Sequence, residues 1–360
     1  MHDLKINSTV KVYYYYIIPV RKVLKKWEEK KYPGHLLYGL TEFAKYYISI
    51  IIHDIHVNPY KNRCLLSLYN LKKILFCKEQ FDVVYAVTHR GLEILIFLRA
   101  LGLYNKPIIL WHHTAIVKSS NFIREKLSCL FYKGIDLCYF FSEELYRRSI
   151  STGKVNPNHA KVINWGADLE FYDQYHILSK EKKFVSTGRE HRDFLTLLKA
   201  VSQTTVPCEI LAPKQEIKHD KELDLLLESL PSNVQFKKVQ LTVEDIVQTV
   251  VDSSAVLICC LNYPYTIGLT TLVEALALGK PIITTDNPTF PFDVEKEKVG
   301  LKVPYGDVNA WVKAINYLST HEEEAINMGK KARILAEERF NLKSFSRVIA
   351  QDLLRYKKSS

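Results

Sequence analysis

Short apolar runs rich in β-branched and aromatic residues alternate with longer mixed stretches in the first half of the chain. The runs that read as strands are 10–18, 48–54, 82–87 and 107–113. Helical patterns begin at about Leu36 and cover 62–78. Because strands separated by helical segments are typical of a parallel sheet covered by helices, this half predicts a doubly wound α/β domain.

The second half repeats the rhythm. Its strand-like runs are 183–188, 208–213, 234–239, 255–261 and 281–286. We therefore predict two Rossmann-like domains, at 1–175 and 176–340, joined through 164–175 and the polar stretch 177–183. A last helix within 341–360 is expected to cross back to the first domain. Since open α/β sheets bind ligands beyond the carboxyl ends of their strands, the active site is expected in the cleft between two facing domains.

Composition limits the class of protein and the cellular compartment. The 360 residues are 47% apolar, which allows two ordinary cores, and the seven cysteines show no paired CxxC spacing. Neither a disulfide framework nor a zinc site is indicated, and a reducing compartment fits best. The first residues lack the features of a signal peptide, and no apolar run approaches the roughly 20 residues that span a bilayer. We expect a cytoplasmic protein, with at most a peripheral attachment at the inner face of the cell membrane.

The net charge of +11 is concentrated in the first half. Residues 1–175 contain 25 Lys and Arg against 15 Asp and Glu, whereas residues 176–360 contain 25 against 24. A basic half of this kind suggests an anionic partner such as nucleic acid, phospholipid or a phosphorylated acceptor, or it is only a soluble surface.

The segment YTIGLTTLVEALALGKPIITTD, residues 265–286, is the most informative. Gly268 allows close approach of a ligand, and a helix then opens with the amides of Leu269, Thr270 and Thr271. Free N–H groups at a helix start can bind a diphosphate. Glu274, one turn on, is placed to accept hydrogen bonds from ribose hydroxyls. The alternative is an amphipathic helix with Glu274 on its solvent face.

These residues resemble the donor site of the family 4 retaining glycosyltransferases, a GT-B family. The matching positions of its EAxAxGxP ending are Glu274, Ala275, Ala277, Gly279 and Pro281. Further similar segments follow in the family's order: 164–172, 184–200, 299–315 and 328–340. The resemblance covers most of 155–345 and implies the GT-B fold, two Rossmann-like domains facing across a cleft.

Two departures concern the donor site. The family usually has two glutamates eight positions apart, and Thr266 stands in place of the first, which lies beside the transferred sugar. After Gly188, Arg189 occupies the family's Arg position, but the Lys expected five residues later is Phe194, and Arg192 is the replacement we expect. Two guanidiniums would neutralise the diphosphate, unless both are solvated loop residues.

In the first half the resemblance is weaker. His112 and His113 end a strand, and a histidine there contacts the donor sugar in related enzymes; the alternative is an ordinary hydrogen-bonded histidine. The segment 32–39 takes the place of the family's glycine-rich loop, and THRG follows another strand. The residues expected to line the acceptor cleft are Gly34, His35, His89 and Arg90.

The resemblance implies a retaining glycosyltransferase that moves a sugar from a nucleotide diphosphate to a hydroxyl of a glycan or lipid-linked acceptor, in bacterial surface polysaccharide assembly. The chain has no DxD motif at a plausible strand end, and neither a metal nor a cofactor is expected. The residues expected to act in catalysis are His112, His113, Arg189, Arg192 and Glu274.

The segment 115–134 combines apolar and basic residues at helical spacing. Its apolar members are Phe122, Ile123, Leu127, Leu130 and Phe131, set among Lys118, Arg124, Lys126 and Lys133. Such a helix can lie on an anionic bilayer, or it packs its apolar stripe on the sheet.

Three other functions are alternatives to this one. A nucleic-acid binder is disfavoured because no RRM, KH, zinc-finger or helix-turn-helix signature is present. A catalytically silent GT-B partner subunit is suggested by Thr266, and a GT-B sugar-nucleotide epimerase would share the donor site.

Overall fold

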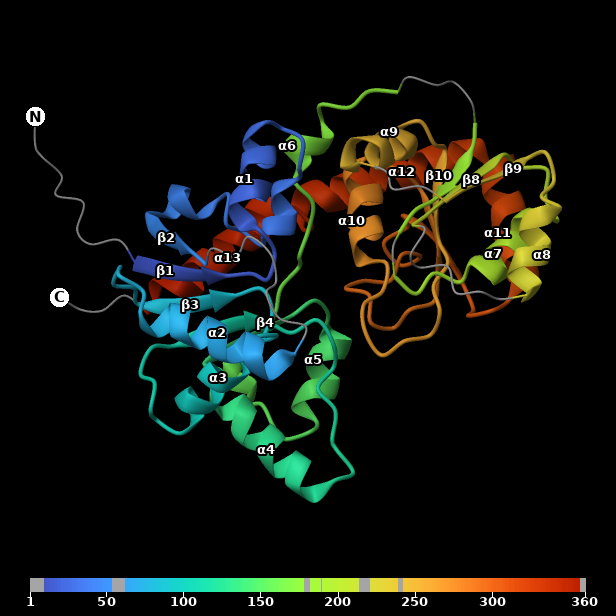
Figure 1. Cartoon of the computed structure of the whole chain (residues 1–360). Coiled ribbons are helices and arrows are strands. Elements are labelled where there is room, and N and C mark those ends of the chain that lie inside the picture. Colours follow the sequence, from blue (N-terminus) through green and yellow to red (C-terminus); the bar gives the residue numbers. More distant parts are fainter. Residues whose placement is uncertain are drawn as a thin grey trace, which may run out of the picture. The chain divides into compact units, whose positions relative to one another are not determined.

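Figure 1 shows the computed structural model of the chain. The structure describes residues 10–53, 62–177, 182–188, 190–213, 221–238 and 242–356. The chain divides into two compact units, which we call the N-terminal unit and the C-terminal unit. The N-terminal unit comprises Met1–Lys30, Gly34–Trp165 and Leu342–Ser360, and the C-terminal unit comprises Lys31–Pro33 and Gly166–Asn341.

The chain enters the C-terminal unit at Gly166, earlier than residue 175. The reason is a close backbone contact: the amide of Ala167 donates to the carbonyl of Phe340 at 2.9 Å. A Cβ at Gly166 would collide with the backbone of Phe340 and Asn341, so only glycine fits there. Of the polar stretch predicted as part of the linker, residues 178–181 lie outside the described part of the chain.

The N-terminal unit is built on a six-stranded sheet in the order β2-β1-β3-β4-β5-β6, with every pairing parallel. Its strands are β1 (Val10–Tyr15), β2 (Ile48–Ile52), β3 (Val83–Ala86), β4 (Ile108–Trp111), β5 (Leu137–Phe140) and β6 (Ala160–Val162). The four strands predicted in this half are confirmed with shorter bounds, and β5 and β6 are additional. Apart from β2 and β6, the strands are almost wholly buried, as a parallel sheet covered on both faces requires.

Helices cover this sheet (Figure 1). They are α1 (Val20–Glu28), α2 (Arg63–Leu75), α3 (Glu93–Ala100), α4 (Phe122–Lys133), α5 (Glu143–Ile150) and α13 (Leu342–Leu354), with the 3₁₀ turns η1 (Gly34–Leu37), η2 (Phe43–Tyr46) and η3 (Pro157–His159). The predicted helix from about Leu36 is wrong. Tyr38, Gly39 and Tyr47 have φ angles of 52°, 93° and 56°, and an α-helix cannot continue through left-handed residues.

Buried polar side chains fix α13 in the N-terminal unit. The carboxylate of Asp352, on α13, accepts a hydrogen bond from the Tyr139 hydroxyl at 3.1 Å. It also forms an ion pair with Lys161 at 2.9 Å. Inside the sheet, Trp111 Nε1 donates to the Tyr85 hydroxyl at 2.7 Å. The large aromatic residues of the strands therefore fill the core with their polar atoms satisfied.

The C-terminal unit has a second six-stranded parallel sheet, in the order β12-β11-β10-β7-β8-β9. Its strands are β7 (Phe184–Ser186), β8 (Cys208–Ala212), β9 (Val234–Lys238), β10 (Ala255–Ile258), β11 (Ile282–Thr285) and β12 (Gly300–Val303). The helices are α6 (Leu169–Tyr172), α7 (Phe194–Val201), α8 (Lys221–Glu228), α9 (Val243–Val251), α10 (Leu269–Ala277), α11 (Val308–Thr320) and α12 (Glu322–Glu338). All five strands predicted in this half are confirmed. In the ranges that the structure describes, no helix has the length and hydropathy needed to span a membrane.

Candidate donor site and the histidines of the N-terminal unit

Helix α10 opens with a glycine turn at the carboxyl ends of the strands. Gly268 precedes the helix with φ 88°, and a Cβ there would lie 2.7 Å from Cγ2 of Ile258. Gly268, the N-cap residue, gives the first turn no side-chain cap hydrogen bond. The N–H groups of Leu269, Thr270 and Thr271 therefore form the kind of helix start that binds anions.

The loop after β7 is tied to this helix start through Arg192. Its guanidinium donates to the carbonyl oxygens of Thr187 at 3.1 Å and Glu190 at 3.2 Å, to Thr271 Oγ1 at 3.0 Å and to Cys260 Sγ at 3.5 Å. Arg192 is thus a half-buried tie between two loops and α10 rather than a solvated residue.

Two neighbours of Arg192 complete this loop. Gly188 has φ 133°, and a Cβ there would collide with the Arg192 guanidinium. Arg189, the other expected diphosphate ligand, lies outside the described residues.

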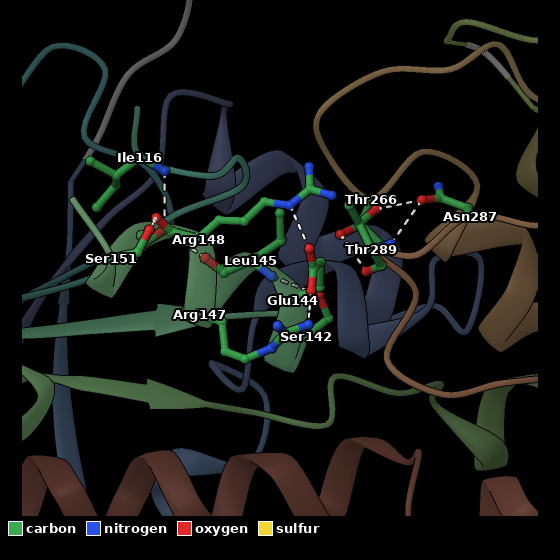
Figure 2. Close-up of polar contacts among 11 residues, drawn as sticks. Ile116, Ser142, Glu144, Leu145, Arg147, Arg148, Ser151, Thr266, Asn287 and Thr289 are labelled. Atoms are coloured by element: carbon green, nitrogen blue, oxygen red, sulfur yellow. Dashed lines mark hydrogen bonds and ion pairs between the residues drawn. The ribbon is translucent and has the colours of Figure 1, made fainter. Parts of the chain in front are cut away.

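Thr266 is held by the loop after β11, as Figure 2 shows. Its hydroxyl donates to the carbonyl of Thr289 at 3.2 Å. The Asn287 side chain accepts from the amide and hydroxyl of Thr289, at 2.9 and 2.8 Å. Sequence reasoning missed Asn287 and Thr289; the only available signal was their place directly after a strand, in TTDNPT.

Glu274 lies on α10 beside a buried tyrosine. The pKa of the Tyr172 hydroxyl is raised well above its ordinary value, first by burial and then by the charge of Glu274 and a hydrogen bond to it. The end of the same helix is also fixed, because Arg333 donates to the carbonyl of Ala277 at 2.7 Å while it pairs with Asp173 at 2.6 Å. Glu274 therefore sits on a firmly packed helix, next to a polar neighbour, and not on a fully solvated face.

His113 is the exposed member of the histidine pair after β4. Its Nε2 bonds to the carbonyl of Val87 at 2.8 Å, so this nitrogen carries the proton and donates. The ring packs against Phe141 with centroids 5.1 Å apart and against Tyr38 at 5.9 Å. The ring is therefore oriented at the edge where β3 and β4 end.

The ring of His112 has a different environment. It is buried, and its ring nitrogens meet the carbonyl of Thr114 at 2.7 Å and the hydroxyl of Tyr132 at 3.0 Å. Burial, with a smaller effect of His89, lowers the pKa of His112 to about 3, so the ring is neutral at ordinary pH. Of the two candidate histidines, only His113 is exposed to a ligand.

The predicted acceptor residues are spread over different environments. His89 stacks on His112 at 5.4 Å, and burial lowers its pKa, while Arg90 is exposed. Gly34 and His35 are buried: His35 packs on Trp165 at 5.0 Å, and burial lowers the pKa of His35 to about 3. His35 is therefore an interior residue, and only His89 and Arg90 lie near a strand end with partial or full exposure.

The structure thus brings the predicted donor residues together around α10 in the C-terminal unit, apart from Arg189, which is not described. His89, His112 and His113 gather in the N-terminal unit. Within the described ranges, no group of three or more His, Cys, Asp or Glu side chains is arranged to hold a metal ion.

Comparison with known proteins gives one family match. Residues 182–321 match the family model described as Glycosyl transferases group 1. This segment contains α10 and the loops after β7 and β10. No curated protein matches the sequence.

Solved structures share the fold over nearly the whole chain. HepE from Anabaena, crystallised with UDP, is 16% identical, covering 97% of this chain and 100% of its own with a TM-score of 0.66. A glycosyltransferase from Rickettsia africae is 15% identical, with coverage of 98% and 100% and a TM-score of 0.69. Sucrose-phosphate synthase from Thermosynechococcus elongatus is 15% identical, with coverage of 97% and 99% and a TM-score of 0.70. At such identities the likeness establishes the fold.

The chain therefore has the GT-B fold of two Rossmann-like units, and its residues 182–321 are similar to glycosyl transferases group 1.

Proposed function

We propose that this protein transfers a sugar from a nucleotide diphosphate donor bound at the start of α10. The observation that carries the proposal is the uncapped first turn of α10 after Gly268, inside the segment that matches the family model. That HepE was crystallised with UDP and with UDP-glucose supports a nucleotide sugar as the donor.

Each part of the donor has a proposed partner. The amides of Leu269 and Thr270 hold the diphosphate, because a helix start carries partial positive charge. Arg192 adds its charge and fixes the loop after β7 to the first turn of α10, and Arg189 contacts the phosphates directly. Glu274 accepts hydrogen bonds from the ribose hydroxyls.

The proposed reaction is a displacement that retains configuration. The bond between the anomeric carbon and the β-phosphate oxygen breaks, and an acceptor hydroxyl forms the new bond from the same face. Its proton passes to the departing phosphate oxygen. Catalysis is mainly electrostatic, since amides and guanidiniums stabilise the charge that develops on the leaving group, so the reaction needs no metal or cofactor.

The acceptor is proposed to be a lipid-linked glycan met at an anionic membrane surface, as in bacterial surface polysaccharide assembly. Support comes from α4, whose Phe122, Ile123 and Leu127 are exposed by 73%, 69% and 51%. No residue of α4 is fully buried, although Phe131 near its end packs on Phe97 of α3 at 5.5 Å. The helix thus anchors one end on the fold and leaves the other end apolar, exposed and flanked by basic residues.

A second helix, α2, also has exposed apolar and basic residues. Helix α2 packs on α3, and α3 on α4. The exposed apolar residues of α2 and its C-terminal end are Leu65, Leu68, Leu75 and Phe76. Exposed Lys72 and Lys78 accompany them, so an amphipathic surface of both helices would meet anionic lipid.

A ligand screen tests the donor proposal. We expect one of UDP, GDP or ADP, and its hexose conjugates, to raise the melting temperature, since a ligand at 100 times its Kd adds about 2.7 kcal/mol. Absence of any shift with all three bases would contradict donor binding.

A second measurement separates the rivals. Release of nucleoside diphosphate that depends on added acceptor supports transfer. Binding without any turnover would favour a silent partner subunit, as Thr266 suggests, and conversion of the donor sugar without acceptor would favour an epimerase.

A further inference from the structure

Three aromatic rings gather beside the start of α10 and have no part in the reaction described so far. The His191 ring lies over Tyr263 with centroids 3.9 Å apart, and Tyr265 meets His191 at 5.7 Å and Tyr263 at 6.0 Å. All three are half-buried. We call them the aromatic cluster.

Backbone contacts hold the two loops of this cluster together. The amide of Leu261 donates to the carbonyl of His191 at 2.9 Å, and Arg192 forms an antiparallel bridge with Cys260. His191 and Arg192 therefore pair with Cys260 and Leu261 as a short antiparallel ribbon, from which the His191 ring projects.

His191 adopts an unfavourable backbone conformation to take its place. Its φ is 51°, in the left-handed region that costs a side-chain-bearing residue about 1 kcal/mol or more. Such strain persists only where surrounding contacts over-determine it, and it is concentrated at ligand sites.

Residues adjacent to the aromatic cluster show where it lies relative to helix α10. Arg192 follows His191 directly and reaches Thr271 in the first turn of α10 at 3.0 Å. Tyr265 precedes Gly268, whereas Glu274 lies one turn further into the helix. The cluster therefore adjoins the N-terminal end of α10, whereas Glu274, the proposed ribose contact, lies further along the helix.

We propose that the aromatic cluster binds the transferred sugar, a hexopyranose, through the C–H-lined face of its ring. This inference rests on the proposed donor site. An apolar sugar face and an aromatic ring exclude water from each other, whereas phosphate gains nothing from that contact. The cluster thereby provides a sugar contact that does not depend on a glutamate at position 266.

The test compares each nucleoside diphosphate with its hexose conjugate by calorimetry, using UDP and UDP-glucose, GDP and GDP-mannose, and ADP and ADP-glucose. For the base that the wild type binds, Tyr263→Ala should weaken the conjugate about tenfold and the diphosphate less than twofold. Tyr263→Phe keeps the ring and should restore most of the affinity.

Folding is controlled by a second variant. His191→Gly removes a ring at a position whose φ favours glycine, so the protein should remain at least as stable and still lose affinity for the conjugate. Tyr317→Ala is the matched control, because Tyr317 stacks on His321 at 4.1 Å at the far end of α11; it should change neither affinity.

Two results would overturn the proposal. Equal losses for the diphosphate and its conjugate would place the rings at the nucleoside end, and no loss in Tyr263→Ala and His191→Gly would make the cluster mere packing. If the wild type binds none of the six ligands, the proposed donor site itself fails, which is a distinct outcome.

Discussion

The two units share an architecture and differ in their surfaces. Each is a six-stranded parallel sheet with helices, and they have nearly equal lengths. The N-terminal unit contains 29 Lys and Arg against 13 Asp and Glu, a net charge of +16, whereas the C-terminal unit contains 21 against 26, a net charge of −5. Of the 18 large hydrophobic side chains exposed in the described ranges, 12 belong to the N-terminal unit.

Because of this difference in charge, the two units are expected to bind anions in different ways. The C-terminal unit is acidic overall, so its proposed diphosphate site must depend on local groups: the amides of α10 and the guanidinium of Arg192. The N-terminal unit has a long-range positive field together with exposed apolar side chains, a combination suited to an extended surface and not to a small ligand.

The largest expected effect is on membrane binding. Replacing Lys118, Arg124, Lys126 and Lys133 by Glu should lower affinity for phosphatidylserine vesicles about 1,000-fold at low salt, since each basic residue near an anionic leaflet contributes about 1 kcal/mol. The measurement is vesicle co-sedimentation. The control reverses four exposed lysines of the C-terminal unit, Lys296, Lys313, Lys330 and Lys331. Equal losses in both variants would refute the assignment of binding to the N-terminal unit.

The second effect is acid lability of the N-terminal unit. Burial lowers the pKa of His35 and of His112 to about 3, against 6.5 for an ordinary histidine. The unfolded chain therefore takes up protons below pH 6.5 that the folded unit excludes. The stability from these neutral rings is fully present above pH 6.5 and falls by about 1.4 kcal/mol per histidine per pH unit as pH drops toward 3.

Urea unfolding at pH 6.5 and 5.5, with hydrogen exchange to locate the unfolding unit, measures this loss. His112→Gln should reduce the pH slope by the share of one histidine, up to about 1.4 kcal/mol per pH unit. The exposed His321, in the C-terminal unit, provides the control His321→Gln. A slope unaffected by His112→Gln would contradict the buried neutral histidine.

The third effect tests the glycine turn of the C-terminal unit. Gly268→Ala should weaken nucleoside diphosphate binding about tenfold or more, because φ is 88° and the new Cβ would lie 2.7 Å from Ile258, which displaces the first turn of α10. Gly306→Ala is the matched control: its φ is 72°, but a Cβ there meets nothing within 4 Å. Both variants should lose about 1 kcal/mol of stability, and only Gly268→Ala should lose calorimetric affinity. Similar affinities for the two variants would remove α10 from the diphosphate site.

Sequence patterns predicted the sheets better than the turns and the site contacts. Nine predicted strands are present because buried parallel strands are continuous apolar runs. The predicted helix near Leu36 is absent because Tyr38 and Tyr47 adopt left-handed backbone conformations. A tyrosine in a sequence gives no indication of such a conformation. The three-residue strand β6 is too short to give a periodic signal.

The site divides in the same way. Gly268 and the start of α10 were readable because glycine and helix periodicity are local features. The sequence did not indicate that His112 is buried while His113 is exposed. The burial of His112 depends on Tyr132 of α4, twenty residues away. Likewise, the tie from Arg192 to Thr271 and the contact of Thr266 with Thr289 join separate loops, and no local pattern encodes them.

The most direct test of the donor site is a double cycle on Glu274. Calorimetry would compare the wild type and Glu274→Gln, each with the preferred donor and with its 2′-deoxyribose form. If Glu274 binds the ribose hydroxyls, the Gln variant should lose about tenfold in affinity, about 1.4 kcal/mol, at a nearly constant melting temperature, and the 2′-deoxy donor should lose affinity against the wild type but little more against the variant. Additive losses, or equal affinities of both proteins for the normal donor, would contradict the placement of the nucleotide at α10.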